Sequence, residues 1–325
     1  MHPLTFRPLL KQYLWGGRRL GSLLGKPIGG DSDYAESWEV VDHGADQSVV
    51  AAGPLAGKTL SQLVNDHGAE LFGKHRDIRG EPRRQFPLLF KFLDAQRTLS
   101  VQVHPNDEQG SLLDPPDLGK TEAWIVLAAE PGSKIYSGLK AGVDRPALAA
   151  AIEAGESDRC LHAFEPKVGD CVFIPAGTVH ALGEGLVIAE IQQASNTTFR
   201  LFDWNRVGKD GQPRPLHIEE SLEVTDYDRG PVAPRTPEPV AADVERLVAC
   251  DKFVLDRRRV SSQASAIGGD GRFHLVAVIA GGAELLCGGD VTALPLGTTA
   301  LAPASAGAVE LASPTGATVL DMYLP

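Results

Sequence analysis

The sequence predicts a mainly all-β protein, an antiparallel sandwich or barrel with helical inserts, followed by a second, smaller β domain. Many short runs rich in branched and aromatic residues are alternating or continuously apolar, as strands are. Glycine and proline, with 35 and 23 residues, separate these runs as turn residues do. The clearest strand-like runs are FPLLFKFLDA, LSVQVHP, EAWIVLAA, DCVFIPAG, LVIAEIQQ and TFRLFDW.

Two segments have helical rather than strand periodicity. Residues 59–72 begin at Thr59, whose hydroxyl is suited to cap the first turn of a helix. Residues 144–154 begin at Asp144, another capping residue, and are followed by Gly155, a residue type that commonly ends helices. We expect both helices to be inserts between strands of the first β unit.

The length of the chain favours two domains, because 325 residues exceed the usual size of one hydrophobic core. The proline-rich segment 228–239 lacks apolar periodicity and is the best candidate for a connector. Further strand-like runs joined by glycine-rich turns follow it. We therefore predict one domain over residues 1–235 and a smaller β domain over residues 236–325.

Composition excludes several classes of partner. The chain has 31 basic and 42 acidic residues, a net charge of -11, which argues against nucleic acid and against an anionic membrane. No leader pattern or apolar run of membrane-spanning length is visible, so a cytoplasmic location is expected. The four cysteines form no C-x-x-C pair, so neither a disulfide framework nor a thiolate zinc site is indicated. An anionic ligand would need a local basic pocket.

The stretch LSVQVHP raises a specific question about function. In a strand, successive side chains point to opposite faces, so Val101 and Val103 share one face while Ser100, Gln102 and His104 share the other. The valines are suited to pack against the protein. The row of hydroxyl, amide and imidazole groups is suited to bind a ligand.

A second pattern lies at residues 169–180, which read G-x5-P-x-G-x2-H and end at His180. This resembles the second motif of the cupin superfamily, small jelly-roll barrels that hold a metal inside. The first cupin motif has the form H-x-H followed by a glutamate. Here Gln102 replaces the first histidine, and the acid arrives after an insert, as Glu122.

Longer segments narrow the resemblance to one branch of that superfamily. The chain is similar to the type I phosphomannose isomerases, in particular to their short bacterial form, from about Tyr13 to Trp204. The motifs occur in the expected order. The segments that carry the resemblance are YLWGG, YAESWEV, FPLLFKFLDA, LSVQVHPND, GKTEAW, PAGTVHALG and NTTFRLFDW.

The resemblance implies a metal-binding catalytic cupin domain and a degenerate cupin-like C-terminal domain. It assigns four metal ligands: Gln102, His104, Glu122 and His180. Two imidazoles, one carboxylate and an amide oxygen suit one zinc ion per chain, with other divalent ions as alternatives. Two alternatives stay open, since Gln102 could orient a ligand from outside the coordination shell and Glu122 could form a buried ion pair with Lys120.

The implied reaction interconverts mannose 6-phosphate and fructose 6-phosphate through a cis-enediol, which needs an acid-base group and an anion clamp. The resemblance gives catalytic roles to Arg200, Lys120 and Glu190, with the last two as rival proton-transfer bases. Ser100 is expected to contact the phosphate and Lys91 to reach the substrate.

Each of these residues has a structural alternative. Arg200 could form a structural ion pair with Asp203 or Glu190. Ser100 could be a hydroxyl bonded to the backbone, and Lys91 could extend to the surface.

Two other functions fit the same barrel. One is a metal-dependent cupin enzyme of a different reaction type, such as an oxygenase, because a fold does not fix a function. The other is a protein that binds a sugar phosphate without turnover. We expect a small sugar phosphate as partner and a monomer or homodimer as the assembly.

Overall fold

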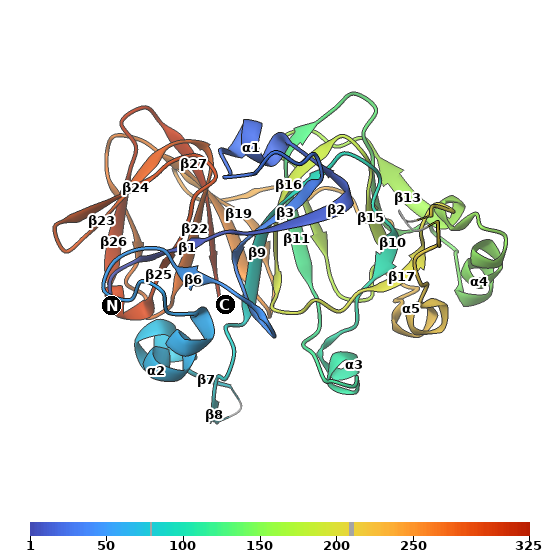
Figure 1. Cartoon of the computed structure of the whole chain (residues 1–325), viewed down its shortest axis with the longest axis horizontal. Helices are drawn as coiled ribbons and strands as arrows, with labels where there is room; N and C mark the ends of the chain where they lie inside the picture. Colours follow the sequence, from blue (N-terminus) through green and yellow to red (C-terminus); the bar gives the residue numbers. More distant parts are fainter. Residues whose placement is uncertain (79, 208–210) are drawn as a thin grey trace.

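The computed structural model describes residues 1–78, 80–207 and 211–325. Two β units lie side by side, with the green and yellow strands in one and most of the orange and red strands in the other (Figure 1). Strand residues greatly outnumber helical residues in the described chain, so the predicted mainly all-β class is confirmed.

The first unit consists of a six-stranded and a five-stranded antiparallel sheet that pack face to face. In order, the six-stranded sheet contains β14 (Cys171–Ile174), β11 (Glu122–Ala129), β16 (Leu186–Gln193), β9 (Leu88–Ala95), β3 (Tyr34–Val40) and β2 (Leu9–Gly17). The five-stranded sheet contains β13 (Leu161–Phe164), β12 (Ile135–Leu139), β15 (His180–Leu182), β10 (Val101–Val103) and β17 (Phe199–Phe202).

The second unit pairs an eight-stranded with a four-stranded sheet around its own apolar cluster. The larger sheet contains β18 (Glu238–Ala241), β19 (Val244–Ala249), β20 (Val254–Val260), β27 (Ala317–Tyr323), β22 (His274–Gly281), β25 (Thr299–Ala302), β1 (Leu4–Arg7) and β6 (Val49–Val50). The smaller sheet contains β21 (Ser265–Gly268), β26 (Ala308–Ala312), β23 (Ala283–Cys287) and β24 (Asp290–Leu294).

The N-terminal strand crosses between the two units. Leu4 of β1 pairs with Leu301 of β25, so the start of the chain lies in the sheet formed mainly by the C-terminal segment. The domain boundary at residue 235 stays a prediction. β1 and β6 precede this boundary in the sequence but lie in the larger sheet of the second unit.

The central strands of the first unit are buried on both faces. All eight residues of β9 and of β16 are buried. Their outward-facing residues, such as Phe90 and Ile191, share one core with Leu275 and Met322 of the second unit. Their other face is directed into the first unit, where any polar side chain must find a partner inside the protein.

Both predicted helices are present. Helix α2 (Leu60–Phe72) starts after Thr59, which forms a reciprocal capping box with Gln62. Helix α4 (Arg145–Glu153) starts after Asp144, whose carboxylate accepts the backbone N–H of Ala147. The sequence patterns missed three shorter helices and three 3-10 turns: α1 (Arg19–Leu24), α3 (Asp107–Ser111), α5 (Ile218–Val224), η1 (Gly73–His75), η2 (Ser157–Cys160) and η3 (Ala304–Ala306).

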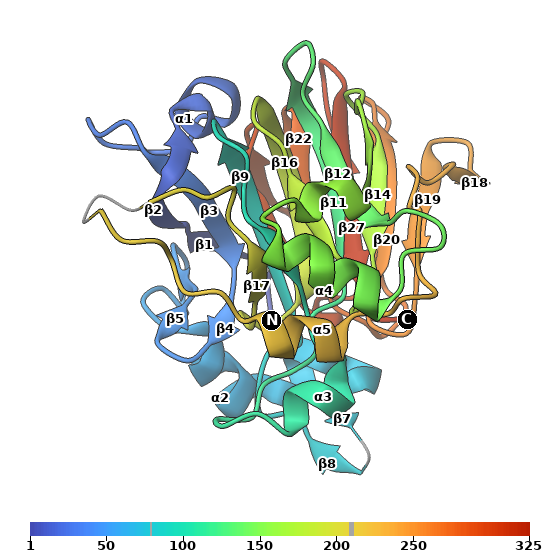
Figure 2. The same cartoon turned by 90° about the vertical axis from the view of Figure 1, so that its right-hand side faces the viewer.

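Helices α4 and α5 cover the outer face of the five-stranded sheet (Figure 2). Val101 and Val103 of β10 are fully buried in the cluster that contains Leu148 of α4 and Leu222 of α5. This confirms the prediction that the valines pack against the protein, and it places them on the outside of the barrel. The polar residues between and beside them therefore face the barrel interior.

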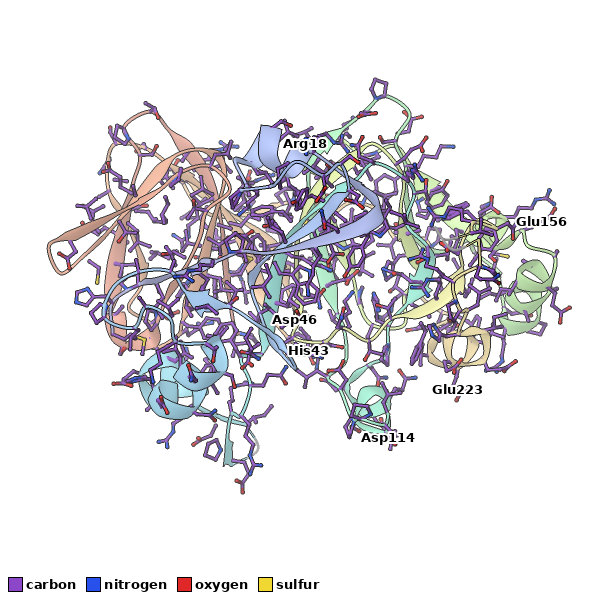
Figure 3. The ribbon with its side chains drawn as sticks, viewed as in Figure 1. Arg18, His43, Asp46, Asp114, Glu156 and Glu223 are labelled. Carbon is purple, nitrogen blue, oxygen red and sulfur yellow. The ribbon has the colours of Figure 1, made fainter. Side chains whose placement is uncertain are left out.

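The remaining elements lie at the periphery. Arg18, Asp114 and Glu223 are exposed there, and their side chains point outward (Figure 3). None of the described helices has the length and apolar character needed to cross a membrane. The described residues also form two small ribbons: β4 (Asp42–His43) with β5 (Asp46–Gln47), and β7 (Asp77–Ile78) with β8 (Glu81–Pro82).

Candidate active site

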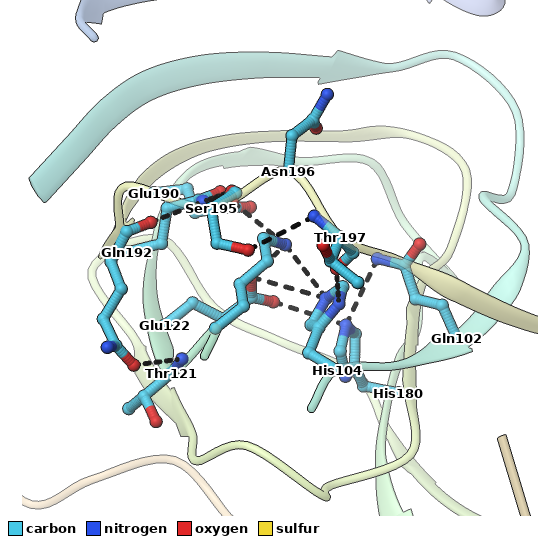
Figure 4. A network of polar contacts seen from close by, with 12 residues as sticks. Gln102, His104, Thr121, Glu122, His180, Glu190, Gln192, Ser195, Asn196 and Thr197 are labelled. Carbon is cyan, nitrogen blue, oxygen red and sulfur yellow. Dashed lines mark hydrogen bonds and ion pairs between the residues drawn. The ribbon is translucent and has the colours of Figure 1, made fainter. Parts of the chain in front are cut away.

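Three residues from three strands or their ends meet inside the first unit in a group that could hold a metal ion: His104, Glu122 and His180. Their ligand atoms all lie within 4.8 Å of one another, and each residue is at most 1% exposed. Oε1 of Glu122 lies 3.3 Å from Nε2 of His180, and Oε2 lies 3.7 Å from Nε2 of His104. Figure 4 shows the imidazoles and the carboxylate converging.

The backbone orients both imidazoles. Nδ1 of His104 donates to the carbonyl oxygen of Thr197 at 2.9 Å, and Nδ1 of His180 donates to that of Thr178 at 2.8 Å. Each ring therefore directs the lone pair of Nε2 towards Glu122. Burial and the charge of Lys120 hold the pKa of His104 well below its usual value and lower that of His180 to about 3. Both rings are neutral near pH 7, as metal ligation requires.

Gln102 adjoins this group. It is the direct cross-strand partner of His180 in the ladder between β10 and β15. Its amide nitrogen lies 3.2 Å from Nε2 of His180. Rotating the amide by half a turn would place its oxygen where the nitrogen now lies, near Nε2 of His180. The side chain of Gln102 is therefore long enough to act as a metal ligand.

Lys120 contacts two members of the group. Its Nζ lies 2.6 Å from Oε2 of Glu122 and 2.9 Å from Nε2 of His104. The ion pair that was the structural alternative for Glu122 is therefore present. It leaves Oε1 of Glu122 buried without a hydrogen-bond partner among the described residues. A buried carboxylate oxygen without a partner, 3.3 Å from Nε2 of His180, fits a bound cation.

A cavity of about 340 Å³ lies beside this group. It is lined by all the residues predicted for catalysis and substrate binding, together with Gln102: Lys91, Ser100, Gln102, Lys120, Glu190 and Arg200. It is also lined by residues to which sequence analysis gave no role, among them Tyr13, Trp15, Glu36, Trp124 and Arg214.

Lys91 lies between two carboxylates of the cavity wall rather than at the surface. Its Nζ is 3.3 Å from Oε1 of Glu190 and 3.5 Å from Oε1 of Glu36. Burial lowers the pKa of Lys91, but these carboxylates outweigh it and raise the pKa above the usual value. Burial and the nearby Glu122 carboxylate raise the pKa of Glu190.

Arg200 lies on β17, directly opposite Gln102 of β10. Its Nη1 donates to the carbonyl oxygen of Pro215 at 2.9 Å. Among the described residues it forms no ion pair with Asp203 or Glu190, which removes its structural alternative. Asp203 instead binds two other arginines. Burial and the nearby Arg214 lower the pKa of Arg200.

Some of the residues that line the cavity lie in segments that the sequence already singled out. Tyr13 and Trp15, whose rings stack with centroids 5.6 Å apart, belong to the quoted run YLWGG. Glu36 belongs to YAESWEV, where a carboxylate in a strand-like run was a signal. Arg214 lies in a segment without periodicity, and nothing local indicated its position.

Comparisons with known proteins agree with this architecture. The family model for the phosphomannose isomerase type I catalytic domain matches residues 4–122. Mannose-6-phosphate isomerase ManA of Bacillus subtilis is 36% identical over 311 residues, covering 95% of each chain. Probable mannose-6-phosphate isomerase GmuF of the same organism is 37% identical over 266 residues, covering 81% of this chain and 82% of the relative.

A solved structure gives the same result at the level of the fold. The crystal structure of the mannose 6-phosphate isomerase from Bacillus subtilis superposes with a TM-score of 0.88 at 27% identity, covering 99% of both chains. ManA thus matches nearly the whole chain in sequence, and the crystal structure matches nearly the whole chain in fold. The chain belongs to the type I phosphomannose isomerase family.

Proposed function

We propose that this family member interconverts mannose 6-phosphate and fructose 6-phosphate in the cavity beside His104, Glu122 and His180. The observation that carries the proposal is the juxtaposition of a buried group that could hold a cation with a cavity lined by a carboxylate of raised pKa and by an arginine without an ion pair among the described residues. An aldose-ketose isomerase needs these parts together: acid-base groups, charge stabilisation and an anion clamp.

Zinc is the proposed metal, one ion per chain, with other divalent ions as alternatives. His104, His180, Glu122 and the amide oxygen of Gln102 would hold it. Two imidazoles, one carboxylate and one neutral oxygen are a donor set that suits a catalytic zinc site. When bound, the ion supplies positive charge that stabilises an oxyanion on the sugar.

Glu190 is the proposed proton-transfer base, which takes the C2 proton of the open-chain sugar and returns it at C1. Burial and the charge of Glu122 raise its pKa, which brings it closer to the range suited to acid-base work near pH 7. Its Oε1 lacks a well-aligned hydrogen bond among the described residues, although Lys91 lies within ion-pair distance. Lys120, bonded to Glu122, would donate to an oxygen of the substrate.

Three further residues complete the proposed substrate site. Arg200 keeps its positive charge under all relevant conditions and would stabilise the enediolate or bind the phosphate. The buried hydroxyl of Ser100 would donate to the phosphate. Lys91 would hold Glu190 in place and face a sugar hydroxyl.

The proposal retains three expectations from the sequence. They are a cytoplasmic location, a monomer or homodimer as the assembly, and a metal-binding catalytic domain over residues 1–235 with a C-terminal β domain over 236–325.

The test is a coupled assay that detects fructose 6-phosphate formed from mannose 6-phosphate, with Glu122→Gln as the site variant. We expect turnover by the wild type and its loss in the variant. Sugar-phosphate binding without turnover would instead indicate a binding protein. Oxygen consumption without isomerisation would indicate a different cupin enzyme.

A further inference from the structure

A cluster of arginines shares one carboxylate at the edge of the cavity. Asp203 accepts hydrogen bonds from Arg206 and from Arg214, and Arg200 lies close enough for the charge of Arg214 to affect its pKa. Two guanidinium groups thus bind a single acid, and that of Arg200 lies nearby. The excess of positive charge contrasts with the net charge of -11 of the whole chain.

Asp203 fixes the orientation of Arg214. Nε of Arg214 donates to Oδ2 of Asp203 at 2.7 Å, and Nη2 donates to Oδ1 at 2.6 Å. This two-point contact uses one edge of the guanidinium plane. Nη1 has no hydrogen-bond partner among the described residues, and the side chain lines the same cavity as Arg200.

Arg200 also has an unused donor. Its Nε is buried and has no hydrogen-bond partner among the described residues, whereas its Nη1 is bonded to a backbone carbonyl. A buried N–H without an acceptor is costly, so an acceptor supplied by a ligand would be stabilising there. Arg200 and Arg214 therefore both line one cavity, and each has an N–H group without a hydrogen-bond partner among the described residues.

The segment that follows β17 lies beside the backbone of Ser100. Nε1 of Trp204 donates to the carbonyl oxygen of Leu99 at 2.6 Å, and Nη1 of Arg206 donates to that of Thr98. These bonds hold the backbone before Ser100 against the segment that begins at Asp203. Ser100, Arg200 and Arg214 all line the cavity, and these bonds keep the start of β10 next to the segment that follows β17.

We propose that Arg214 is a phosphate-binding residue, that it forms the site for the 6-phosphate together with Arg200 and Ser100, and that Asp203 positions it. This inference rests on the proposed function, because it assigns the phosphate of that substrate to a particular end of the cavity. No motif in the sequence assigns a role to Arg214.

The chemistry of the cluster supports a phosphate rather than a carboxylate ligand. A phosphate monoester carries between one and two negative charges near pH 7 and offers three oxygens as acceptors. It can accept from Arg200, from Arg214 and from a hydroxyl at once, and it balances the excess positive charge. The guanidinium fork is suited to such an anion.

The test uses the metal-loaded full-length enzyme and compares Arg214→Ala with Arg97→Ala as a matched control. Arg97 is exposed and lines an adjoining pocket with Arg214 but does not line the catalytic cavity. Each variant is assayed with mannose 6-phosphate and with unphosphorylated mannose. Binding of inorganic phosphate is measured separately by calorimetry.

For Arg214→Ala we expect KM for mannose 6-phosphate and Kd for inorganic phosphate to rise by about 10- to 100-fold, the size of a lost charge-assisted contact. The kcat/KM for mannose should fall much less than that for mannose 6-phosphate. Both constants of the control Arg97→Ala should stay close to those of the wild type. Asp203→Asn should give a smaller rise in both constants, and Arg214→Lys should recover part of the loss.

Two results would overturn the inference. One is unchanged phosphate binding in Arg214→Ala. The other is an equal loss with mannose and mannose 6-phosphate, which would indicate a general structural effect. Failure of the proposed function is distinguishable, because a wild type without isomerase activity would still bind inorganic phosphate through Arg214 if the assignment of this residue is right.

Discussion

Nζ of Lys91 lies 3.3 Å from Oε1 of Glu190, and the two residues occupy directly paired positions on β9 and β16. Glu36 approaches Lys91 from β3, the other neighbouring strand, at 3.5 Å. A single buried ammonium group thus lies between two buried carboxylates. In the proposed mechanism it also keeps the base Glu190 close to the substrate.

Removing this ammonium should strongly destabilise the fold. Lys91→Met removes the ammonium group nearest to the buried Glu36 and Glu190, although Lys120 stays 4.0 Å from Oε1 of Glu190. Breaking a buried ion pair in this way costs about 3–5 kcal/mol. Urea unfolding of the metal-free protein would measure the loss. The double variant Lys91→Met/Glu190→Gln should be less destabilised than the sum of the single variants, because it removes one of the uncompensated charges. Additive losses would show that the pair is not coupled.

Proton transfer by Glu190 predicts a specific isotope pattern. In deuterated water the wild type should introduce deuterium at C1 of fructose 6-phosphate, because the abstracted proton exchanges on the base. Glu190→Gln should reduce kcat by about 100-fold or more and abolish the exchange, since an amide cannot act as the base. Magnetic resonance of the products checks both effects. Exchange that persists in Glu190→Gln but disappears in Lys120→Met would assign the base to Lys120.

Asp117 supports one proposed metal ligand from a distance. Its Oδ2 accepts hydrogen bonds from the hydroxyls of Ser195 and Thr197 at 2.8 and 2.7 Å. The carbonyl oxygen of Thr197 in turn accepts the Nδ1 proton of His104. The orientation of His104 therefore depends on a carboxylate that does not touch it.

Loss of this support should weaken metal binding without preventing folding. Asp117→Asn is expected to lower zinc affinity by about 10- to 100-fold, as removal of groups that orient metal-binding histidines does. Competition with a coloured chelator would measure the affinity. The matched control is Asp114→Asn, because Asp114 is exposed and lies in the same loop, shortly before Asp117. Equal affinities in the two variants would contradict the support role.

The second unit contains a histidine with a different environment. Nδ1 of His274 lies 2.7 Å from Oδ1 of Asp321, and Nε2 lies 3.4 Å from Oδ1 of Asp270. Burial lowers the pKa of His274, but the two carboxylates outweigh it and raise the pKa above the usual value. Arg258 also bonds Asp321, and the ring of Tyr323 packs against His274.

This environment predicts stability that depends on pH. Because the folded-state pKa is raised, the contribution of His274 is complete below the unfolded-state pKa of about 6.5 and is lost as the pH rises through the folded-state value. The difference in unfolding free energy between the wild type and His274→Gln should therefore shrink from about pH 6.5 upward. Chemical unfolding at a series of pH values checks this. A difference that is constant with pH would show that His274 does not become charged in the folded protein.

Local patterns in the sequence predicted the parts of the fold that depend on neighbouring residues. Alternation along LSVQVHP separated Val101 and Val103 from Gln102 correctly, because side chains of a strand must point to opposite faces. Thr59 predicted the start of α2 because capping is a contact within one turn. Both predictions needed only a few consecutive residues.

Contacts between segments that are distant in the sequence could not be predicted from local patterns. The pairing of β1 with β25 brings Leu4 beside Leu301, and no periodicity indicates which strands become neighbours. The position of Arg214 depends on Asp203 in a loop without regular structure. Lys91 interrupts an apolar strand, but the carboxylates that bury it come from two other strands. The roles of the site residues stay predictions that the variants above test.

A metal titration of chelator-treated protein tests the proposed metal dependence, with metal content and fructose 6-phosphate formation measured on the same samples. We expect negligible isomerisation by stripped protein and a linear recovery of activity that ends at about one zinc ion per chain. Glu122→Gln should neither retain the ion nor recover activity. Full isomerase activity in protein that contains no metal would show that the reaction does not depend on an ion at His104, Glu122 and His180.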